Sequence, residues 1–193
     1  MGFTAINAQG LSAPPYFLAF LISVTTPWLS DRYKQRGLMV AFLSIVGCVG
    51  FNLLATCEAV SLRYIGVWLA AGGVFPAVAN ILPWTMNNQG SDTRRGMGVI
   101  IFNAVGQCSP FLGSNIFPRS EGPRYVRGQA ISAGFMAFNC MLALALRTLL
   151  VWENRKLDKR YGTLAERARQ RDERGEQTVV AEENYGPDYI YEL

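Results

Sequence analysis

The sequence predicts an all-α integral membrane protein. Between Leu11 and Trp152 the chain holds five apolar stretches of roughly 20 residues, the length a helix needs to cross about 30 Å of hydrocarbon. These stretches contain almost no charge. Because lipid offers no hydrogen-bond partners for exposed backbone groups, a segment within it must be a helix or part of a closed barrel.

Charge is distributed unevenly along the 193 residues. The chain is 50% hydrophobic and 17% charged, and eight of its 18 Lys/Arg and ten of its 14 Asp/Glu follow Trp152. We therefore predict a transmembrane domain over 1–152 and a charged, largely disordered tail over 153–193. The net charge of +4 comes from short loops and this mixed tail, so we expect no nucleic acid partner.

The first span is predicted over 11–30. Pro14 and Pro15 are expected at its start, where missing N–H groups do little harm, and Pro27 is expected to bend or close it. A basic loop over 31–37 follows.

The second and third spans are predicted over 38–56 and 64–85. Gly47 and Gly50 in the second span favour close approach of a neighbouring helix. The third span carries a glycine pair and two prolines, a content that membrane helices tolerate better than soluble ones.

The fourth and fifth spans are predicted over 96–117 and 129–152. Arg147 is the one full charge within a predicted span, and it lies near the end. It is expected to extend to the membrane interface; the alternative is a buried functional charge. Counting basic residues in the loops and the start of the tail places the 31–37 loop and the C-terminus in the cytoplasm.

Metal and enzymatic chemistry find little support in the sequence. There is no histidine, which removes the commonest metal ligand and general base. The cysteines lack CxxC spacing, so they are interpreted as packing residues without a metal, cofactor or disulfide. With no intramembrane carboxylate pair, Gly-rich phosphate loop or nucleophile–base set, we predict a protein that is not an enzyme and has no catalytic residues.

The most specific local pattern lies between the first two spans. Asp31 and Arg32 leave the end of one predicted helix, and Arg36 and Gly37 begin the next after a tight turn. Arg32 can donate to carbonyls at the negative pole of the ending helix, and Asp31 can face the positive N-terminus of a neighbour. This geometry would join two helices as a gate; an ordinary basic loop that sets topology fits equally well.

This segment resembles the cytoplasmic signature loop of the major facilitator superfamily. Wider matches resemble the allantoate permease-like anion:cation symporters of fungi, from Gly2 to about Trp152, and the last residues resemble the usual ending of that family. The matching residues are 7–16, 28–37, Asn87-Asn88, Arg94-Arg95, Pro123-Arg124-Tyr125 and 187–193.

The resemblance implies the C-terminal half of a twelve-helix carrier, with the five spans corresponding to helices eight to twelve. It implies secondary transport of a small organic anion, such as a carboxylate vitamin or ureide, with protons in the intact protein. The implied partners are the lipid bilayer, the anion and proton, and a missing N-terminal half, in a multi-pass protein of the plasma membrane. The alternative is a truncated, non-transporting membrane protein that acts through helix association or is inert.

Uncharged polar residues are the candidates for a substrate path. Asn and Gln amides can donate to a carboxylate without the desolvation cost of a buried charge. The spans hold no carboxylate, so proton coupling is expected in the missing half or not at all. Hydrogen bonding between helices is the alternative use of such residues. The path candidates are Tyr16, Asn80, Trp84, Asn87, Asn88, Asn103 and Gln107, with Asn115 and Asn139 as further amides.

Overall fold

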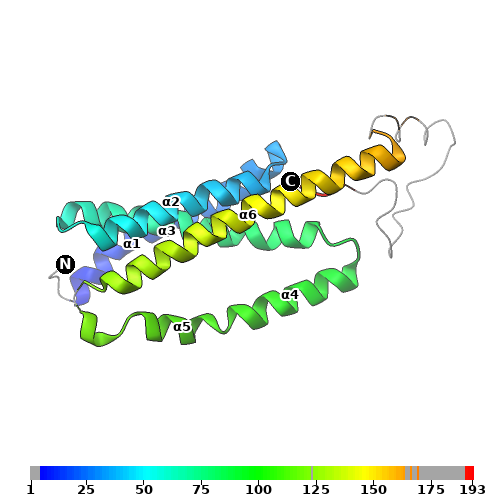
Figure 1. The fold of residues 1–193 in the computed structure, drawn as a ribbon. Helices are drawn as coiled ribbons and strands as arrows, with labels where there is room; N and C mark the ends of the chain where they lie inside the picture. The colour runs from blue at the N-terminus through cyan, green and yellow to red at the C-terminus, as the bar shows by residue number, and fades with distance from the viewer. Residues whose placement is uncertain (1–4, 123, 164–165, 167–168, 170–189) are drawn as a thin grey trace.

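The structure is a computed structural model that describes residues 5–122, 124–163, 166, 169 and 190–193. Every regular element in these residues is helical, which confirms the all-α prediction. The elements are α1 (Ala5–Tyr33), α2 (Arg36–Thr56), α3 (Val60–Asn87), α4 (Asp92–Gly106), α5 (Ser109–Ile116), the short 3₁₀ helix η1 (Arg119–Glu121) and α6 (Val126–Tyr161) (Figure 1).

The helices run back and forth along one axis. Helices α1, α2, α3 and α6 lie side by side, while α4 and α5 follow each other along one side of the bundle (Figure 1). The end of the bundle that carries the turn at 34–35 and the loop at 88–91 is called the first-turn end below. Lys34 ends α1 there with a left-handed backbone (φ 51°), and the N–H of Gln35 donates to the carbonyl of Ser30.

Four stretches are long and apolar enough to cross a membrane: α2, α3, the α4–α5 stretch over 93–116, and α6. They correspond to four of the five predicted spans. Helix α1 has the length but is not among the helices that meet both criteria, so a membrane crossing by α1 stays a prediction.

The first predicted span differs from α1 at both ends. Pro14 and Pro15 lie inside α1 rather than at its start, and the helix continues through Pro27 to Tyr33. The fixed φ of proline is compatible with a helix, and each proline removes only one backbone hydrogen bond. The fourth predicted span, 96–117, corresponds to the 93–116 stretch, although the helix within it is divided at 107–108 between α4 and α5.

The start of the tail is also helical, because α6 continues to Tyr161. Lys156 lies 3.2 Å from the ring centre of Trp152 and pairs with Glu153 at 2.8 Å, and basic residues follow at the helix end, where the dipole favours them. The remaining tail lies mostly outside the described residues.

Glycines bring α2 and α3 into backbone contact. A Cβ atom added to Gly73 would lie 2.3 Å from the backbone N of Gly47, and one added to Gly50 would lie 2.3 Å from the backbone N of Ala70. No side chain fits at such distances. The predicted close approach at Gly47 and Gly50 is therefore confirmed.

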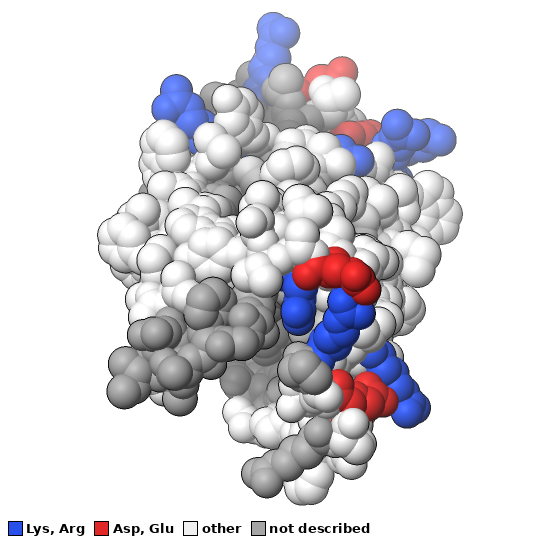
Figure 2. All heavy atoms as spheres, turned by 90° about the vertical axis from the view of Figure 1, so that its left-hand side faces the viewer, with Lys and Arg blue, Asp and Glu red and all other residues white. Residues whose placement is uncertain are grey.

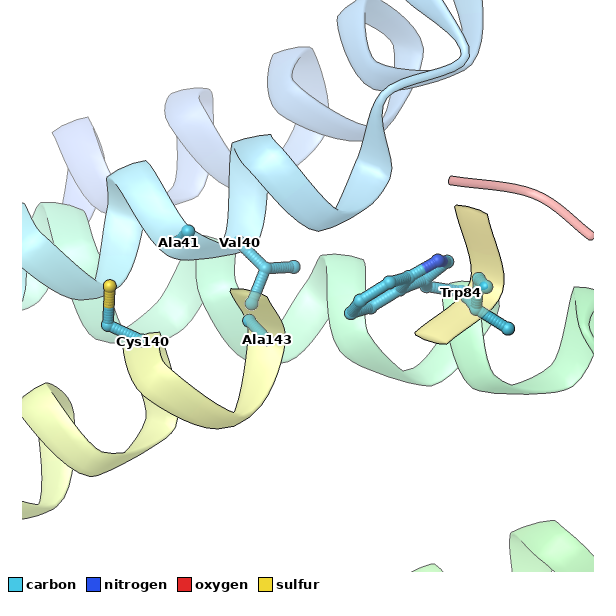
Figure 3. Packing of buried hydrophobic residues seen from close by; sticks show 6 residues of the cluster. Val40, Ala41, Trp84, Cys140 and Ala143 are labelled. Atoms are coloured by element: carbon cyan, nitrogen blue, oxygen red, sulfur yellow. The ribbon is translucent and has the colours of Figure 1, made fainter. Parts of the chain in front are cut away.

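A small apolar core lies toward the first-turn end. It contains Val40, Ala41, Trp84, Cys140, Ala143 and Leu150. Figure 3 labels the first five of these side chains, which come from α2, α3 and α6. Cys140 packs as predicted, whereas Cys108 is exposed, so the packing interpretation fails there because α4 and α5 have few neighbours.

Large apolar side chains cover much of the outer surface. Phe17, Phe42, Val105, Phe111 and Phe138 are all exposed. Figure 2, which views the bundle from the end opposite the first-turn end, shows a largely uncharged surface with basic and acidic side chains interspersed. Exposed apolar surface on this scale suits contact with lipid better than contact with water.

Candidate functional site

Charged side chains from two helices meet at the first-turn end. Arg36 is the first residue of α2, and its guanidinium pairs with Asp31 near the end of α1. The Nε of Arg36 also lies 3.0 Å from Oε1 of Glu192. Since this Nε donates no hydrogen bond among the described residues, the second contact is an ion pair without an aligned hydrogen bond. The Arg36 side chain is 7% exposed, so two carboxylates offset the cost of burying it.

Gly37 gives this site its tight geometry. A Cβ atom at Gly37 would lie 3.0 Å from Cζ2 of Trp84 and 3.1 Å from Cβ of Arg147. The missing side chain therefore lets α2 lie against α3 and α6 directly beside Arg36.

Arg147 points toward the same end of the bundle. Its Nη2 donates to Oε1 of Gln35 at 2.9 Å, while its Nε is buried without a hydrogen-bond partner in the described part of the chain. The guanidinium therefore binds a protein side chain at the first-turn end, and its expected extension to the membrane interface stays a prediction.

Arg32 lies apart from the Arg36 cluster. It is exposed, and its guanidinium carbon lies 5.7 Å from the ring centre of Trp28. The expected donation from Arg32 to the carbonyls ending α1 is not among the described contacts. Asp31 does face the N-terminal residue of α2, through its ion pair with Arg36.

Three predicted path residues come together around Glu192. Trp84 donates from Nε1 to the backbone oxygen of Glu192 at 2.9 Å, and Asn87 donates from Nδ2 to its Oε2 at 2.8 Å. Asn88 accepts from the backbone N–H of Glu192 at 2.8 Å and donates to its backbone oxygen at 3.1 Å. In this structure their partner is a residue of the same chain.

Asn80 is buried between helices. Its Nδ2 donates to Oγ1 of Thr26 on α1 at 2.9 Å and to the backbone oxygen of Pro76 at 2.8 Å. Its Oδ1 is buried without a partner in the described residues. These contacts favour the alternative of hydrogen bonding between helices.

The other path candidates lie on separate exposed surfaces. Tyr16 on α1 packs edge-to-face against Phe75, with ring centres 5.6 Å apart. Asn103 donates to the carbonyl of Val99 in its own helix, and Gln107 lies at the break after α4. Their place in a substrate path stays a prediction.

Sequence reasoning missed Asn154 and the chain residues it binds. Asn154 donates to the backbone oxygen of Tyr191 and accepts from its backbone N–H, both at 2.9 Å. The signals available were the family-like ending at 187–193 and an amide just beyond the last apolar span. Asn139 was considered, and it donates to Oγ of Ser44 on α2 at 2.8 Å.

An apolar groove of about 590 Å³ is lined by residues of α1 and α2 and by Gly72 of α3. Thr26, Ser30 and Gln35 are among its few polar lining residues, and no lining residue is charged. None of the predicted path residues lines it. Among the described residues, no group of three or more His, Cys, Asp or Glu is placed to hold a metal ion.

Comparison with known proteins finds similarity to fungal transporters. It is 28% identical over 156 residues to the high-affinity nicotinic acid transporter of Saccharomyces cerevisiae, covering 81% of this chain and 29% of that protein. It is 29% identical over 171 residues to the MFS-type transporter cnsO of Penicillium expansum, covering 85% of this chain and 32% of that protein. It is 28% identical over 166 residues to the MFS transporter prlL of a fungal species, covering 84% of this chain and 34% of that protein.

The chain thus spans about a third of the length of the curated relatives it matches. No family model matches the chain. No solved structure matches it either.

Proposed function

We propose that this chain forms the C-terminal half of a secondary active transporter of the major facilitator superfamily. The observation that carries the proposal is similarity to fungal transporters over more than four-fifths of the chain, at about a third of their length. The apolar exterior and four candidate membrane helices support a place in the bilayer. The low burial of the 93–116 stretch supports a further partner, because none of its most apolar window is buried here.

The proposed substrate is a small organic anion, such as a carboxylate vitamin or ureide, moved with protons across the plasma membrane. One relative is named for nicotinic acid, which supports a carboxylate. We also propose the finer allantoate permease-like assignment, on the motifs at 28–37 and Asn87-Asn88.

In this proposal the first-turn end faces the cytoplasm, together with the C-terminus. The Asp31–Arg36 ion pair joins α1 to α2 and acts as part of the cytoplasmic gate. Gly37 keeps α2 close to Trp84 behind this pair. Tyr16, Asn103 and Gln107 contribute to the path, where their exposed polar groups face the missing half.

Uptake into liposomes tests the proposal. The chain is reconstituted alone and fused after the N-terminal half of one of its fungal relatives, and uptake of labelled nicotinate, pantothenate, biotin and allantoate is measured with and without an inward proton gradient. We expect saturable, proton-dependent uptake of at least one anion by the fused protein. No uptake by either form, with both folded, would reject transport.

Two matched asparagines test the path. Asn103 and Asn52 are both exposed, and each donates to a carbonyl four residues back in its own helix. In the fused protein, Asn103→Ala should raise KM for the transported anion, whereas Asn52→Ala should leave it unchanged. Equal effects would remove Asn103 from the path.

A non-transporting role remains the second candidate. The poorly packed α4–α5 stretch favours it, since an exposed apolar helix can associate with another membrane protein. In that case the chain alone binds a membrane partner, and neither form of the chain takes up anions.

A further inference from the structure

The last described residues of the chain occupy a peptide-shaped site at the first-turn end. The residues 191–193 are called the strap, and the side chains of Arg36, Trp84, Asn88 and Asn154 are called the strap site. They come from α2, α3 and α6. Figure 3 shows the end of the chain passing beside Trp84.

Two asparagine side chains form hydrogen bonds with the backbone of the strap. Asn154 bonds both the N–H and the carbonyl of Tyr191, each at 2.9 Å. Asn88 bonds both the N–H and the carbonyl of Glu192, at 2.8 and 3.1 Å. Successive residues of an extended strand present these groups to opposite sides, so the two amides hold the strap as neighbouring strands would.

The tryptophan adds a third contact to the backbone. Nε1 of Trp84 donates to the carbonyl of Glu192 at 2.9 Å. Trp84 is 2% exposed, and its indole N–H needs a partner at that depth. The strap supplies that partner through the carbonyl of Glu192.

The side chains of the strap add selectivity. The Glu192 carboxylate lies against Arg36 through Oε1, 3.0 Å from Nε, and accepts from Asn87 through Oε2. Tyr191 and Leu193 are partly buried against the apolar core of α2, α3 and α6. The site therefore matches an extended peptide with an apolar residue on each side of a glutamate.

This contact joins three helices that otherwise meet mainly through apolar side chains. The strap bonds α3 through Asn88 and α6 through Asn154, and it neutralises Arg36 on α2. Arg36 also pairs with Asp31 near the end of α1. The same guanidinium therefore contacts the strap and joins α1 to α2.

We propose that the strap site is an intramolecular docking site for residues 191–193, and that the docked strap fastens α2, α3 and α6 together at the first-turn end. Its occupant is this chain's own Tyr-Glu-Leu segment. The inference stands on described contacts and does not rest on transport.

Cysteine accessibility tests the docking in the full chain. Leu193→Cys is introduced after Cys48, Cys57, Cys108 and Cys140 are replaced, and alkylation by a water-soluble maleimide is followed in nanodiscs. The rate is normalised to the rate in SDS. Asn88→Ala and Asn154→Ala, which each remove two hydrogen bonds to the strap, should raise the rate by about tenfold. Asn115→Ala, at an exposed amide that donates only within its own helix among the described contacts, should leave it unchanged.

A variant within the strap itself controls for misfolding caused by the helix substitutions. Glu192→Gln leaves the helices intact and removes the charge that faces Arg36, so it should also raise the alkylation rate. High salt should accelerate alkylation of the parent protein more than that of Glu192→Gln, because salt screens the ion pair. If Glu192→Gln and both asparagine variants alkylate at the rate of the parent, the docking proposal is overturned.

Discussion

Asn80 on α3 donates a 2.9 Å hydrogen bond from Nδ2 to Oγ1 of Thr26 on α1. Asn80 is 1% exposed and Thr26 is 8% exposed. The two residues are 54 positions apart in sequence, so this bond fixes how α1 and α3 meet. Thr26 also donates to the carbonyl of Ile22, whereas Oδ1 of Asn80 has no partner among the described residues.

Because Thr26 has a second hydrogen-bond partner, replacing Thr26 and replacing Asn80 should lower stability by different amounts. Thr26→Val leaves one buried N–H of Asn80 unpaired and should lower the free energy of unfolding by about 1–3 kcal/mol. Asn80→Leu removes the polar group altogether, and Thr26 keeps its bond to Ile22, so this change should cost less. The measurement is unfolding in mixed micelles by SDS, followed by circular dichroism.

The double variant separates this explanation from simple loss of packing. Adding Asn80→Leu to Thr26→Val should recover stability, because the unpaired amide is gone. Additive losses in the double variant would show that the hydrogen bond is not the source of the effect.

The space around two glycines predicts that replacing them by alanine will change stability in opposite directions. Gly73→Ala places a Cβ 2.3 Å from the backbone N of Gly47, so α2 and α3 must separate, at a cost of about 1–3 kcal/mol or more. Gly98→Ala on α4 meets nothing within 4 Å and should stabilise the helix by about 0.5–1 kcal/mol. Thermal unfolding in detergent compares them; a loss for Gly98→Ala equal to that for Gly73→Ala would contradict this packing.

Apolar length and glycine spacing predicted the helices and the α2–α3 contact because both are local properties. The 38–56 prediction matches α2 closely, and Gly47 packs as expected. Helix ends were predicted less well: α1 continues through three prolines to Tyr33, and α6 continues past the apolar stretch to Tyr161.

The candidate site was predicted only in part. Asp31 and Arg36 are five residues apart, so their pairing followed from the turn between two helices. Asn88 and Trp84 were identified as polar or aromatic groups at a helix end, but their partner Glu192 lies more than 100 residues away. Contacts at that separation depend on the path of the whole chain, which local spacing does not encode.

Glu58 and Arg124 predict a local pH dependence at the other end of the bundle. Their Oε1 and Nη2 atoms lie 2.8 Å apart, and the hydrogen bond and charge of Arg124 lower the pKa of Glu58 below its usual value. A lowered pKa means that the pair contributes fully above the usual glutamate pKa and is lost as pH falls through the folded-state pKa. Carboxyl ¹³C NMR should show this titration, and Arg124→Gln should move the pKa of Glu58 upward. Arg127→Gln, which removes the partner of Glu121 instead, should leave it in place.

Replacing Arg36 is expected to lower stability much more than replacing the neighbouring Arg32. Arg36 is buried and faces two carboxylates, whereas Arg32 is exposed beside Trp28. Arg36→Gln should lower the free energy of unfolding by about 1–3 kcal/mol, because it leaves two partly exposed carboxylates, Asp31 and Glu192, without their shared cation. Arg32→Gln should change it by less than about 0.5 kcal/mol.

Arg36→Lys distinguishes charge from geometry at this position. Lysine keeps the charge but lacks the broad planar guanidinium that contacts both carboxylates, so it should recover only part of the lost stability. SDS unfolding of Arg36→Lys, Arg36→Gln and Arg32→Gln measures the three effects together. Equal stability of Arg36→Gln and Arg32→Gln would mean that the buried guanidinium holds neither carboxylate in the membrane-embedded protein, and that Gly37 and Trp84 alone bring the helices together at this end.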